Sequence, residues 1–397
     1  MKKILIFSQA MELGGAETAL LGLLDAIDYE KYSVDLFLMR HSGELLKYIP
    51  KNVNLLPENK KYASLAIPIS TLIKKGQFKI AFLRLFAKIL AALKTNQLGV
   101  IGNNAIGLEY SHKYTRCVMP KISDTEYDLA ISFLTPHYFV DKKVKAKCKI
   151  AWIHTDYSYI KIDTKSELKM WNKFDKIISV SDDVTNSFIK TFPSLKEKVM
   201  LIENIISKNY VNSLVGEFSV DDEMPKNKTI NLLSIGRFCD AKNFDNVPKI
   251  CKLIRDTGLN IKWYLIGFGV DEALIRQKIA EQNMQDYVII LGKKENPYPY
   301  IKACDIYVQP SRYEGKSVAV REAQMLNKPV VITNFPTSKS QLNDGFDGAV
   351  IPMENTACAM SLCDIIKNTA LQQKFIVNTK SFDYTNSREI EKLYSIL

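Results

Sequence analysis

Short apolar segments of strand length alternate with longer segments of helical spacing along almost the whole chain. In the first pair, KKILIFS at 2–8 precedes GAETALLGLLDAI at 15–27, whose apolar residues recur three and four positions apart. Such alternation is typical of βαβ units, in which helices cover both faces of a mostly parallel sheet. We therefore predict an α/β fold with doubly wound sheets. The other expected strands are 32–39, 127–134, 149–154, 176–181, 230–236, 261–267, 287–292, 305–310 and 329–333.

The length of the chain predicts that these units form two Rossmann-like domains. With 397 residues, the chain exceeds one ordinary core and fits two domains of about 150–200 residues each. Ligands of such sheets bind beyond the carboxyl ends of the strands, so we expect the two domains to face a cleft. The predicted boundaries are an N-terminal domain at 1–207, a polar linker at 208–228, a C-terminal domain at 229–380 and a terminal helix at 381–397.

The chain is basic, with 54 Lys and Arg against 43 Asp and Glu and a net charge of +11. An excess of this kind favours anionic partners, such as phosphorylated substrates, acidic lipid surfaces or nucleic acid. The alternative is a basic soluble protein without an anionic partner. Because nucleic-acid binding would rest on charge alone, we predict no nucleic-acid partner.

Cysteine usage and hydropathy indicate a cytoplasmic protein. The seven cysteines are odd in number and include no C-x-x-C pair, which argues for reduced thiols. The apolar run KILIF near the start is of strand length, and charged Glu12 follows it, so a first strand is expected there rather than a signal peptide. No window of about 20 apolar residues is present that would span a membrane.

One segment of the first domain lacks acidic residues altogether, from Asn59 to Leu108. Within it, 78–94 has the spacing of an amphipathic helix, and two interpretations remain open. In the first interpretation the helix lies on an anionic membrane, and the protein is peripheral on the inner face of the cell membrane. In the second the helix packs into the core and exposes a basic face. Its apolar side is expected to contain Phe82, Leu85, Phe86, Ile89, Leu90 and Leu93, with Arg84, Lys88 and Lys94 flanking the other side.

Two glutamates eight residues apart, Glu314 and Glu322, follow the strand expected at 305–310. A helix is expected to begin near Ser317, and the free N–H groups of its first turn favour an anion such as a phosphate. Carboxylates accept hydrogen bonds from vicinal hydroxyls, so the pair suits a molecule with a diol at each end and phosphates between them. The alternative is an ordinary helix with two surface glutamates. The residues expected around the phosphates are Gly315, Lys316, Ser317 and Val318.

Two further groups of residues follow other expected strands. Arg237 and Lys242 come after Gly236 and would neutralise a diphosphate leaving group, unless they are ordinary surface cations. His154 ends the strand expected at 149–154, where it contacts a ligand or is a structural imidazole.

Two other loops after expected strands contain glycines. Gly14 and Gly15 form a tight loop before a helix, and Gly267 lies in another loop. Neither loop has the G-x-G-x-x-G pattern of dinucleotide sites. The alternative is that both are ordinary βα turns. Because no second ligand cluster accompanies His154 and no D-x-D occurs, we predict neither a metal nor a cofactor.

The ordered set GGAE, WIHTD, GRFCDAKNF, IGFG and EGKSVAVREA resembles family 4 of the retaining glycosyltransferases, which have the GT-B fold. The resemblance covers nearly the whole chain, and the second domain is its more specific part. It implies that the N-terminal domain is the acceptor side, that the C-terminal domain binds the nucleotide sugar and that the last helix crosses back to the N-terminal domain. The sequence EGKS departs from the family's usual aromatic-glycine version, which leaves the identity of the sugar open.

The resemblance also implies roles for individual residues. Glu314 contacts the sugar hydroxyls, Glu322 holds the ribose, and Arg237 and Lys242 hold the diphosphate, with the backbone of 316–318 nearby. Gly14 and Gly15 lie near the donor phosphates and the acceptor, and His154 lies close to the donor sugar. The loop around Gly292 and Lys294 holds the base.

The activity implied is retaining transfer of a hexose or N-acetylhexosamine from a UDP-sugar, without a metal. The acceptor is expected to be a lipid-linked glycan or an oligosaccharide in bacterial capsule, exopolysaccharide or lipopolysaccharide synthesis. Two alternatives remain open: a sugar-nucleotide epimerase or phosphorylase on the same fold, and a non-catalytic partner subunit.

Overall fold

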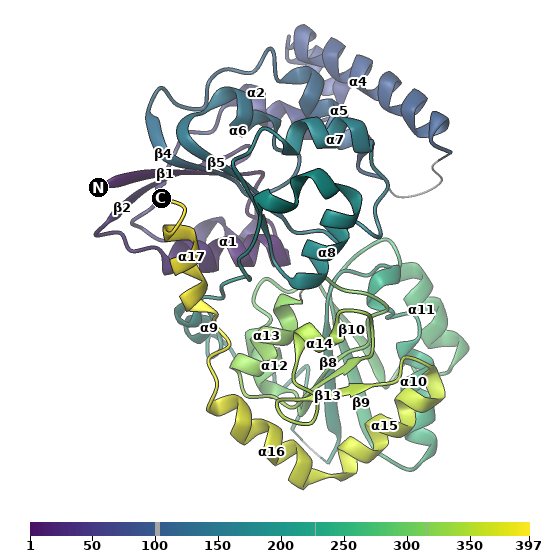
Figure 1. Ribbon diagram of the computed structural model, residues 1–397. Coiled ribbons are helices and arrows are strands. Elements are labelled where there is room, and N and C mark those ends of the chain that lie inside the picture. The colour runs from purple at the N-terminus through teal and green to yellow at the C-terminus, as the bar shows by residue number, and fades with distance from the viewer. Residues whose placement is uncertain (100–103, 227, 316) are drawn as a thin grey trace. The chain divides into compact units, whose positions relative to one another are not determined.

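The computed structural model describes residues 1–99, 104–226, 228–315 and 317–397 (Figure 1). The chain divides into two compact units. Unit 1 comprises Met1–Ile205 together with Ser387–Leu397, and unit 2 comprises Ile206–Asn386. Each unit contains one sheet and its own helices, and each is described by itself.

The sheet of unit 1 has the strand order β3-β2-β1-β4-β5-β6-β7, and all of its neighbouring strands are parallel. The central strands are apolar on both faces because helices cover both, and for this reason their sequences are continuous apolar runs. The expected strands of the first half are confirmed, whereas the short edge strands β3 and β7 were not predicted. The bounds are β1 Lys2–Ser8, β2 Tyr32–Leu38, β3 Asn54–Leu55, β4 Glu126–Ser132, β5 Lys145–Ile153, β6 Lys176–Ser179 and β7 Val199–Leu201.

The sheet of unit 2 has the order β10-β9-β8-β11-β12-β13 and is again parallel between all neighbours. The strand order reverses direction between β8 and β11, which is the position at which ligands bind in sheets of this kind. The bounds are β8 Ile230–Ile235, β9 Ile261–Ile266, β10 Val288–Gly292, β11 Ile306–Gln309, β12 Val330–Thr333 and β13 Ala349–Ile351. The predicted α/β fold with doubly wound sheets is confirmed in both units.

Helices connect these strands as the alternating pattern predicts. In unit 1 they are α1 Gly15–Ala26, α2 Lys60–Ala63, α3 Ile69–Lys74, α4 Phe78–Gln97, α5 Ile106–Thr115, α6 Tyr138–Lys143, α7 Thr164–Trp171, α8 Asp182–Thr191 and α17 Ile390–Tyr394. In unit 2 they are α9 Lys208–Leu214, α10 Val247–Asp256, α11 Glu272–Glu281, α12 Tyr298–Ala303, α13 Val318–Met325, α14 Ser338–Gln341, α15 Asn355–Lys367 and α16 Thr369–Lys380. None of the helices in the described ranges combines the length and the apolar composition needed to cross a bilayer.

The segment 208–228 differs from the expected linker, because it belongs to unit 2 and contains α9. Val211, Leu214 and Met224 are buried there. Asn296 donates a hydrogen bond from its side-chain nitrogen to the carbonyl oxygen of Leu214 at 2.8 Å. The polar composition of this segment suggested a linker, but a few well-spaced apolar residues attach it to the unit.

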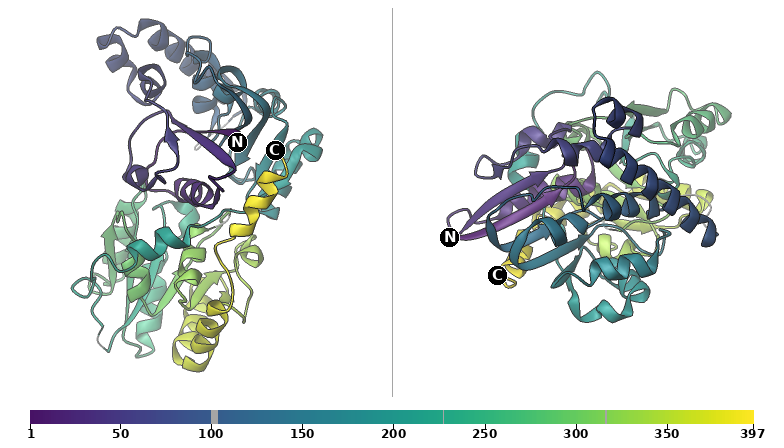
Figure 2. Two further views of the ribbon diagram at one scale, coloured as in Figure 1. Left: turned by 90° about the vertical axis from the view of Figure 1, so that its left-hand side faces the viewer. Right: turned by 90° about the horizontal axis from the view of Figure 1, so that it is seen from above.

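The C-terminal residues return to unit 1. The 3-10 turn η5 at Ser387–Glu389 leads into α17, and the ring of Tyr394 stacks on that of Tyr32 with centroids 4.5 Å apart. The hydroxyl of Tyr394 accepts a hydrogen bond from the backbone N–H of Asp28 at 2.8 Å. The two chain ends lie side by side, where the ammonium group of Lys2 donates to the carbonyl oxygen of Leu397 at 2.8 Å (Figure 2).

Candidate functional site

The side chain of Glu314 lies at the carboxyl edge of the unit 2 sheet, in the turn between β11 and α13. Its Oε1 atom accepts hydrogen bonds from Ser311 Oγ at 2.6 Å, from Gln309 Nε2 at 3.2 Å and from the ammonium group of Lys242. The side chains of Lys242 and Glu314 are only 17% and 9% exposed. The structure therefore brings together, as an ion pair, two residues that the sequence placed in separate motifs.

Two glycines make room for this ion pair. A Cβ atom at Gly236 would lie 3.0 Å from Cε and 3.1 Å from Cδ of Lys242, so the lysine side chain passes directly over this glycine. At Gly267, which has φ +153°, a Cβ atom would lie 1.9 Å from the carbonyl oxygen of Gly236. The ends of β8 and β9 approach each other so closely that only glycine fits at this second position.

The loops after β8 and β11 are held together by residues that the sequence analysis did not select. Arg312 donates from both terminal guanidinium nitrogens to the carboxylate of Asp245, at 2.9 and 2.7 Å. Asn243, which has φ +59°, donates from its side chain to the carbonyl oxygen of Pro310 at 2.9 Å. Bidentate pairs of this kind fix geometry as well as charge. The sequence indicates Arg312, Asp245 and Asn243 only by their position, because they lie in the same loops as the predicted residues.

The turn before α13 contains the residues that the sequence analysis expected around the phosphates. Ser317 is the residue that precedes the first helical residue, Val318. The backbone N–H of Ser317 donates to Oε1 of Gln341 at 2.9 Å, and the side-chain nitrogen of Gln341 donates to the carbonyl oxygen of Gly315 at 3.1 Å. The first-turn N–H groups that begin at Val318 have no partner within the helix and favour an anion. The predicted site residue Lys316 lies outside the described residues.

Glu322 occupies a more enclosed position than Glu314, about one turn into α13. It is 6% exposed, and its Oε1 atom accepts a hydrogen bond from the hydroxyl of Tyr298 at 2.8 Å. Burial raises the pKa of this carboxyl to about 7. Tyr298, which the sequence analysis did not select, therefore orients the second glutamate of the pair.

The remaining predicted residues of unit 2 lie in different surroundings. Arg237 follows Gly236 and is exposed, so its guanidinium is accessible to a ligand. Lys294, expected near a base, forms an ion pair with Glu223 at 2.7 Å and lies 5.0 Å from the ring centroid of Tyr300. Gly292 ends β10 with φ +72°. The Lys294 ammonium is thus held by the segment that the sequence analysis took for a linker.

In unit 1, the predicted residues follow β1 and β5 of the same sheet. Gly14 precedes the first residue of α1, which is Gly15. His154 follows β5, and within the described part of the chain its Nε2 atom is buried without a hydrogen-bond partner. Burial lowers the pKa of His154 to about 4, so the imidazole is neutral at physiological pH. Because β1 and β5 flank β4 in a parallel arrangement, these residues share the carboxyl edge of the sheet.

Metal ligands are not gathered in the described ranges, where no group of three or more His, Cys, Asp and Glu side chains has a suitable arrangement. All seven cysteines are free thiols. Lys242, which pairs with Glu314, and the first turn of α13 are groups of unit 2 that suit an anion.

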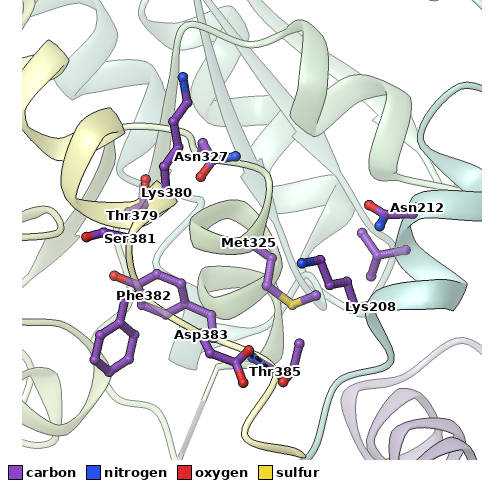
Figure 3. A pocket seen from close by; sticks show the side chains of 12 residues that line it. Lys208, Asn212, Met325, Asn327, Thr379, Lys380, Ser381, Phe382, Asp383 and Thr385 are labelled. Atoms are coloured by element: carbon purple, nitrogen blue, oxygen red, sulfur yellow. Dashed lines mark hydrogen bonds between the residues drawn. The ribbon is translucent and has the colours of Figure 1, made fainter.

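A cavity of about 460 Å³ lies at the opposite end of α13 (Figure 3). Met325, the last residue of this helix, lines it together with Asn327, Lys208 and the segment 379–385. A helix of eight residues separates its two ends by about 12 Å. The cavity is consequently not formed by the residues predicted to bind a nucleotide sugar.

Comparisons with known proteins show which family and which relatives part of the chain resembles. Residues 217–382 match the model of the family described as glycosyl transferases group 1. An uncharacterized 41.2 kDa protein in the cps region of Klebsiella pneumoniae is 24% identical over 230 residues, which cover 55% of this chain and 62% of that protein.

A second relative comes from Campylobacter jejuni. It is named N-acetylgalactosamine-N,N'-diacetylbacillosaminyl-diphospho-undecaprenol 4-alpha-N-acetylgalactosaminyltransferase, and it is 25% identical over 187 residues, or 47% of this chain and 49% of that enzyme. The alignments thus span less than two thirds of the length of both relatives.

Solved structures share the fold of the whole chain. Anabaena HepE, crystallised with UDP and glucose, matches over 100% of both chains with a TM-score of 0.68 and 16% identity. At this identity the likeness concerns the fold alone. Together with the two parallel-sheet units, it confirms the predicted GT-B fold.

Proposed function

We propose that this protein is a retaining glycosyltransferase, which moves a hexose or N-acetylhexosamine from a UDP-sugar to a lipid-linked glycan. The observation that carries the proposal is the Lys242–Glu314 ion pair beside the first turn of α13, at the carboxyl edge of the unit 2 sheet. The match to the family of glycosyl transferases group 1 supports it, because residues 217–382 include this whole arrangement.

In this proposal Glu314 binds the donor sugar. Within the described part of the chain, its three hydrogen-bond donors all contact Oε1. The second oxygen, Oε2, is left to accept hydrogen bonds from sugar hydroxyls. Lys242, Ser311 and Gln309 hold the carboxylate in one orientation, so little reorganisation is needed when the sugar binds.

The diphosphate is proposed to lie beside Lys242. Its ammonium group, the guanidinium of Arg237 and the N–H groups that begin at Val318 would bind the oxygens on which negative charge develops as the bond to the sugar breaks. Such groups act most strongly in a water-poor site. The leaving phosphate would take the proton of the acceptor hydroxyl on the same face of the sugar, which retains the anomeric configuration. Glu322 would hold the ribose, and Gly292 and Lys294 would lie near the base.

The residues of unit 1 keep the roles that the sequence predicted. The neutral imidazole of His154 has an unpartnered Nε2 atom in the described structure, and we assign it to a hydroxyl group of the donor sugar. Gly14 and Gly15 present backbone rather than side chains at the start of α1, which suits close approach of a phosphate or an acceptor.

The acceptor class is supported by the relatives. The Campylobacter enzyme is named for a diphospho-undecaprenol substrate, and the Klebsiella protein is named for a cps region. We therefore propose a lipid-linked acceptor in the assembly of a bacterial surface polysaccharide.

The test measures UDP release from a panel of UDP-sugars, with and without a membrane extract as acceptor. Glu314→Ala is compared with the wild type, and Glu281→Ala on the exposed end of α11 is the matched control. We expect one donor to be turned over, with loss of turnover in Glu314→Ala alone. Nuclear magnetic resonance of the product then reports whether the anomeric configuration is retained.

Other outcomes would overturn the proposal. A wild-type protein that neither hydrolyses nor transfers any donor, and whose melting temperature no UDP-sugar raises, would point to a non-catalytic partner subunit. A UDP-sugar converted to another UDP-sugar without UDP release would indicate an epimerase.

A further inference from the structure

Helix α4 exposes six large apolar side chains on one side and buries the small side chains of Ala87 and Ala91 on the other. Ala87 and Ala91 are buried against Ile106 and Tyr110 of α5. On the opposite side, the exposed fractions range from 42% to 68% for Phe78, Phe82, Leu85, Phe86, Ile89 and Leu93. These six residues are called the α4 apolar face. A helix in an ordinary soluble domain has the reverse arrangement, with its large apolar residues in the core.

The α4 apolar face is a continuous stripe rather than a set of scattered residues. At 100° per residue, its members fall within an arc of about 100°, and the 20 residues of the helix extend for about 30 Å. Figures 1 and 2 show α4 along the outer margin of unit 1. An exposed apolar stripe of this size is typical of an interaction surface.

The charges beside the stripe are all positive. From Asn59 to Leu108 the sequence contains no Asp or Glu, and the exposed cations near α4 are Lys74, Lys75, Lys79 and Lys88. Two other cations face the protein instead. Arg84 donates to the carbonyl oxygen of Ser64 at 3.0 Å, and the ammonium group of Lys94 lies 4.0 Å from the carboxylate of Asp163.

We propose that α4 lies flat on an anionic lipid bilayer, with its apolar face in the region between headgroups and acyl chains. Phenylalanine and leucine side chains enter that region, while lysines beside them contact anionic headgroups. A second copy of this chain is a poorer occupant, because it would bring the same lysines against each other. The proposal concerns binding alone, so it stands or fails independently of the proposed transfer reaction.

The test is co-sedimentation of the full chain with vesicles of phosphatidylcholine alone or with about one third phosphatidylglycerol. Wild-type protein is expected to bind the anionic vesicles and to dissociate at high salt. The double variant Phe82→Glu with Ile89→Glu should lose at least about tenfold in partitioning, since a charge in the apolar region costs more than 1 kcal/mol. The matched control is Met360→Glu with Val377→Glu, which changes two exposed apolar residues of unit 2 and should bind like wild type.

A second variant tests the contribution of charge. Lys79→Gln with Lys88→Gln should weaken binding to anionic vesicles. Circular dichroism and a cooperative thermal unfolding transition check that every variant is folded. Wild-type protein that fails to bind, or an α4 variant that binds as well as wild type, would refute the proposal. A wild-type dimer that the α4 variant converts to a monomer, without vesicle binding, would assign the face to self-association.

Discussion

The ammonium group of Lys242 donates a hydrogen bond to Oε1 of Glu314, although 72 residues separate the two in the chain. The pair joins the loop after β8 to the loop after β11, the two strands between which the order of the sheet reverses. The cation proposed for the diphosphate and the carboxylate proposed for the sugar are thereby fixed relative to each other in the structure without a donor. Changes to either residue, or to the groups that hold them, should therefore affect donor use more than folding.

Replacing Lys242 with methionine should lower kcat/KM for the UDP-sugar by about 100-fold or more, the usual effect of removing one group that stabilises developing charge. Methionine keeps the length of the side chain and removes its charge. Lys252→Met is the matched control, because the side chain of Lys252 is 40% exposed on α10 and pairs with Asp256 four residues along the chain. Steady-state UDP release gives kcat/KM for both variants. Equal values for Lys242→Met and Lys252→Met would contradict the role proposed for Lys242.

Alanine at the two glycines of the site should produce two different defects. Gly236→Ala places its methyl group against the flexible side chain of Lys242, so we expect weaker donor turnover with little change in stability. In Gly267→Ala the new Cβ atom would lie 1.9 Å from the carbonyl oxygen of Gly236, at a residue with φ +153°. Backbone strain of this kind lowers the free energy of unfolding by about 1–3 kcal/mol. Thermal unfolding and UDP release separate the effects; a Gly236→Ala variant with full activity would show that the position of Lys242 is unimportant.

Gln341→Leu should weaken UDP binding although Gln341 was not selected from the sequence. The leucine removes the acceptor of the Ser317 N–H and the donor to Gly315, and an unmet buried hydrogen bond costs about 1–3 kcal/mol. We expect a roughly tenfold higher Kd for UDP by titration calorimetry, which is about 1.4 kcal/mol. Gln277→Leu on α11 serves as the control, and the same Kd in both variants would argue against the role.

Glu322→Gln should change the pH dependence of stability. Burial raises the pKa of Glu322 to about 7 in the folded protein, so at about pH 5–7 the folded state holds a proton that the unfolded chain releases. This carboxyl therefore destabilises the fold progressively as pH rises from about 4.5 to about 7, by about 3 kcal/mol in total. Relative to wild type, the glutamine variant should gain stability over that interval. Urea unfolding at several pH values tests this, and parallel profiles for the two proteins would refute it.

Chelation of divalent cations should leave donor turnover unchanged. The chain lacks the D-x-D pattern, and the proposed site assigns the diphosphate charge to Lys242, Arg237 and the start of α13. UDP release measured with EDTA and with added Mg²⁺ should give the same rate. A rate that falls with EDTA and returns with Mg²⁺ would require a metal in the scheme.

The sequence by itself determined the α/β architecture and the residues most closely tied to it. Central parallel strands are buried on both faces, so β1, β4, β8 and β11 appear as apolar runs that local pattern detects. Glycines, cations and carboxylates directly after such runs necessarily lie at one edge of the sheet. The short edge strands β3, β7 and β13 escaped prediction because they carry too few buried residues to form a pattern.

Only the tertiary structure decided which of these residues meet. Local spacing does not encode contacts between distant parts of the chain. Such contacts pair Lys242 with Glu314, position Gln341 and Tyr298, and attach 208–228 to unit 2. The same holds for α4. Its periodicity defines two faces, but packing of Ala87 and Ala91 against α5 leaves the six residues of the α4 apolar face pointing outward. Steric fit between helices, rather than hydrophobicity alone, selected the buried side.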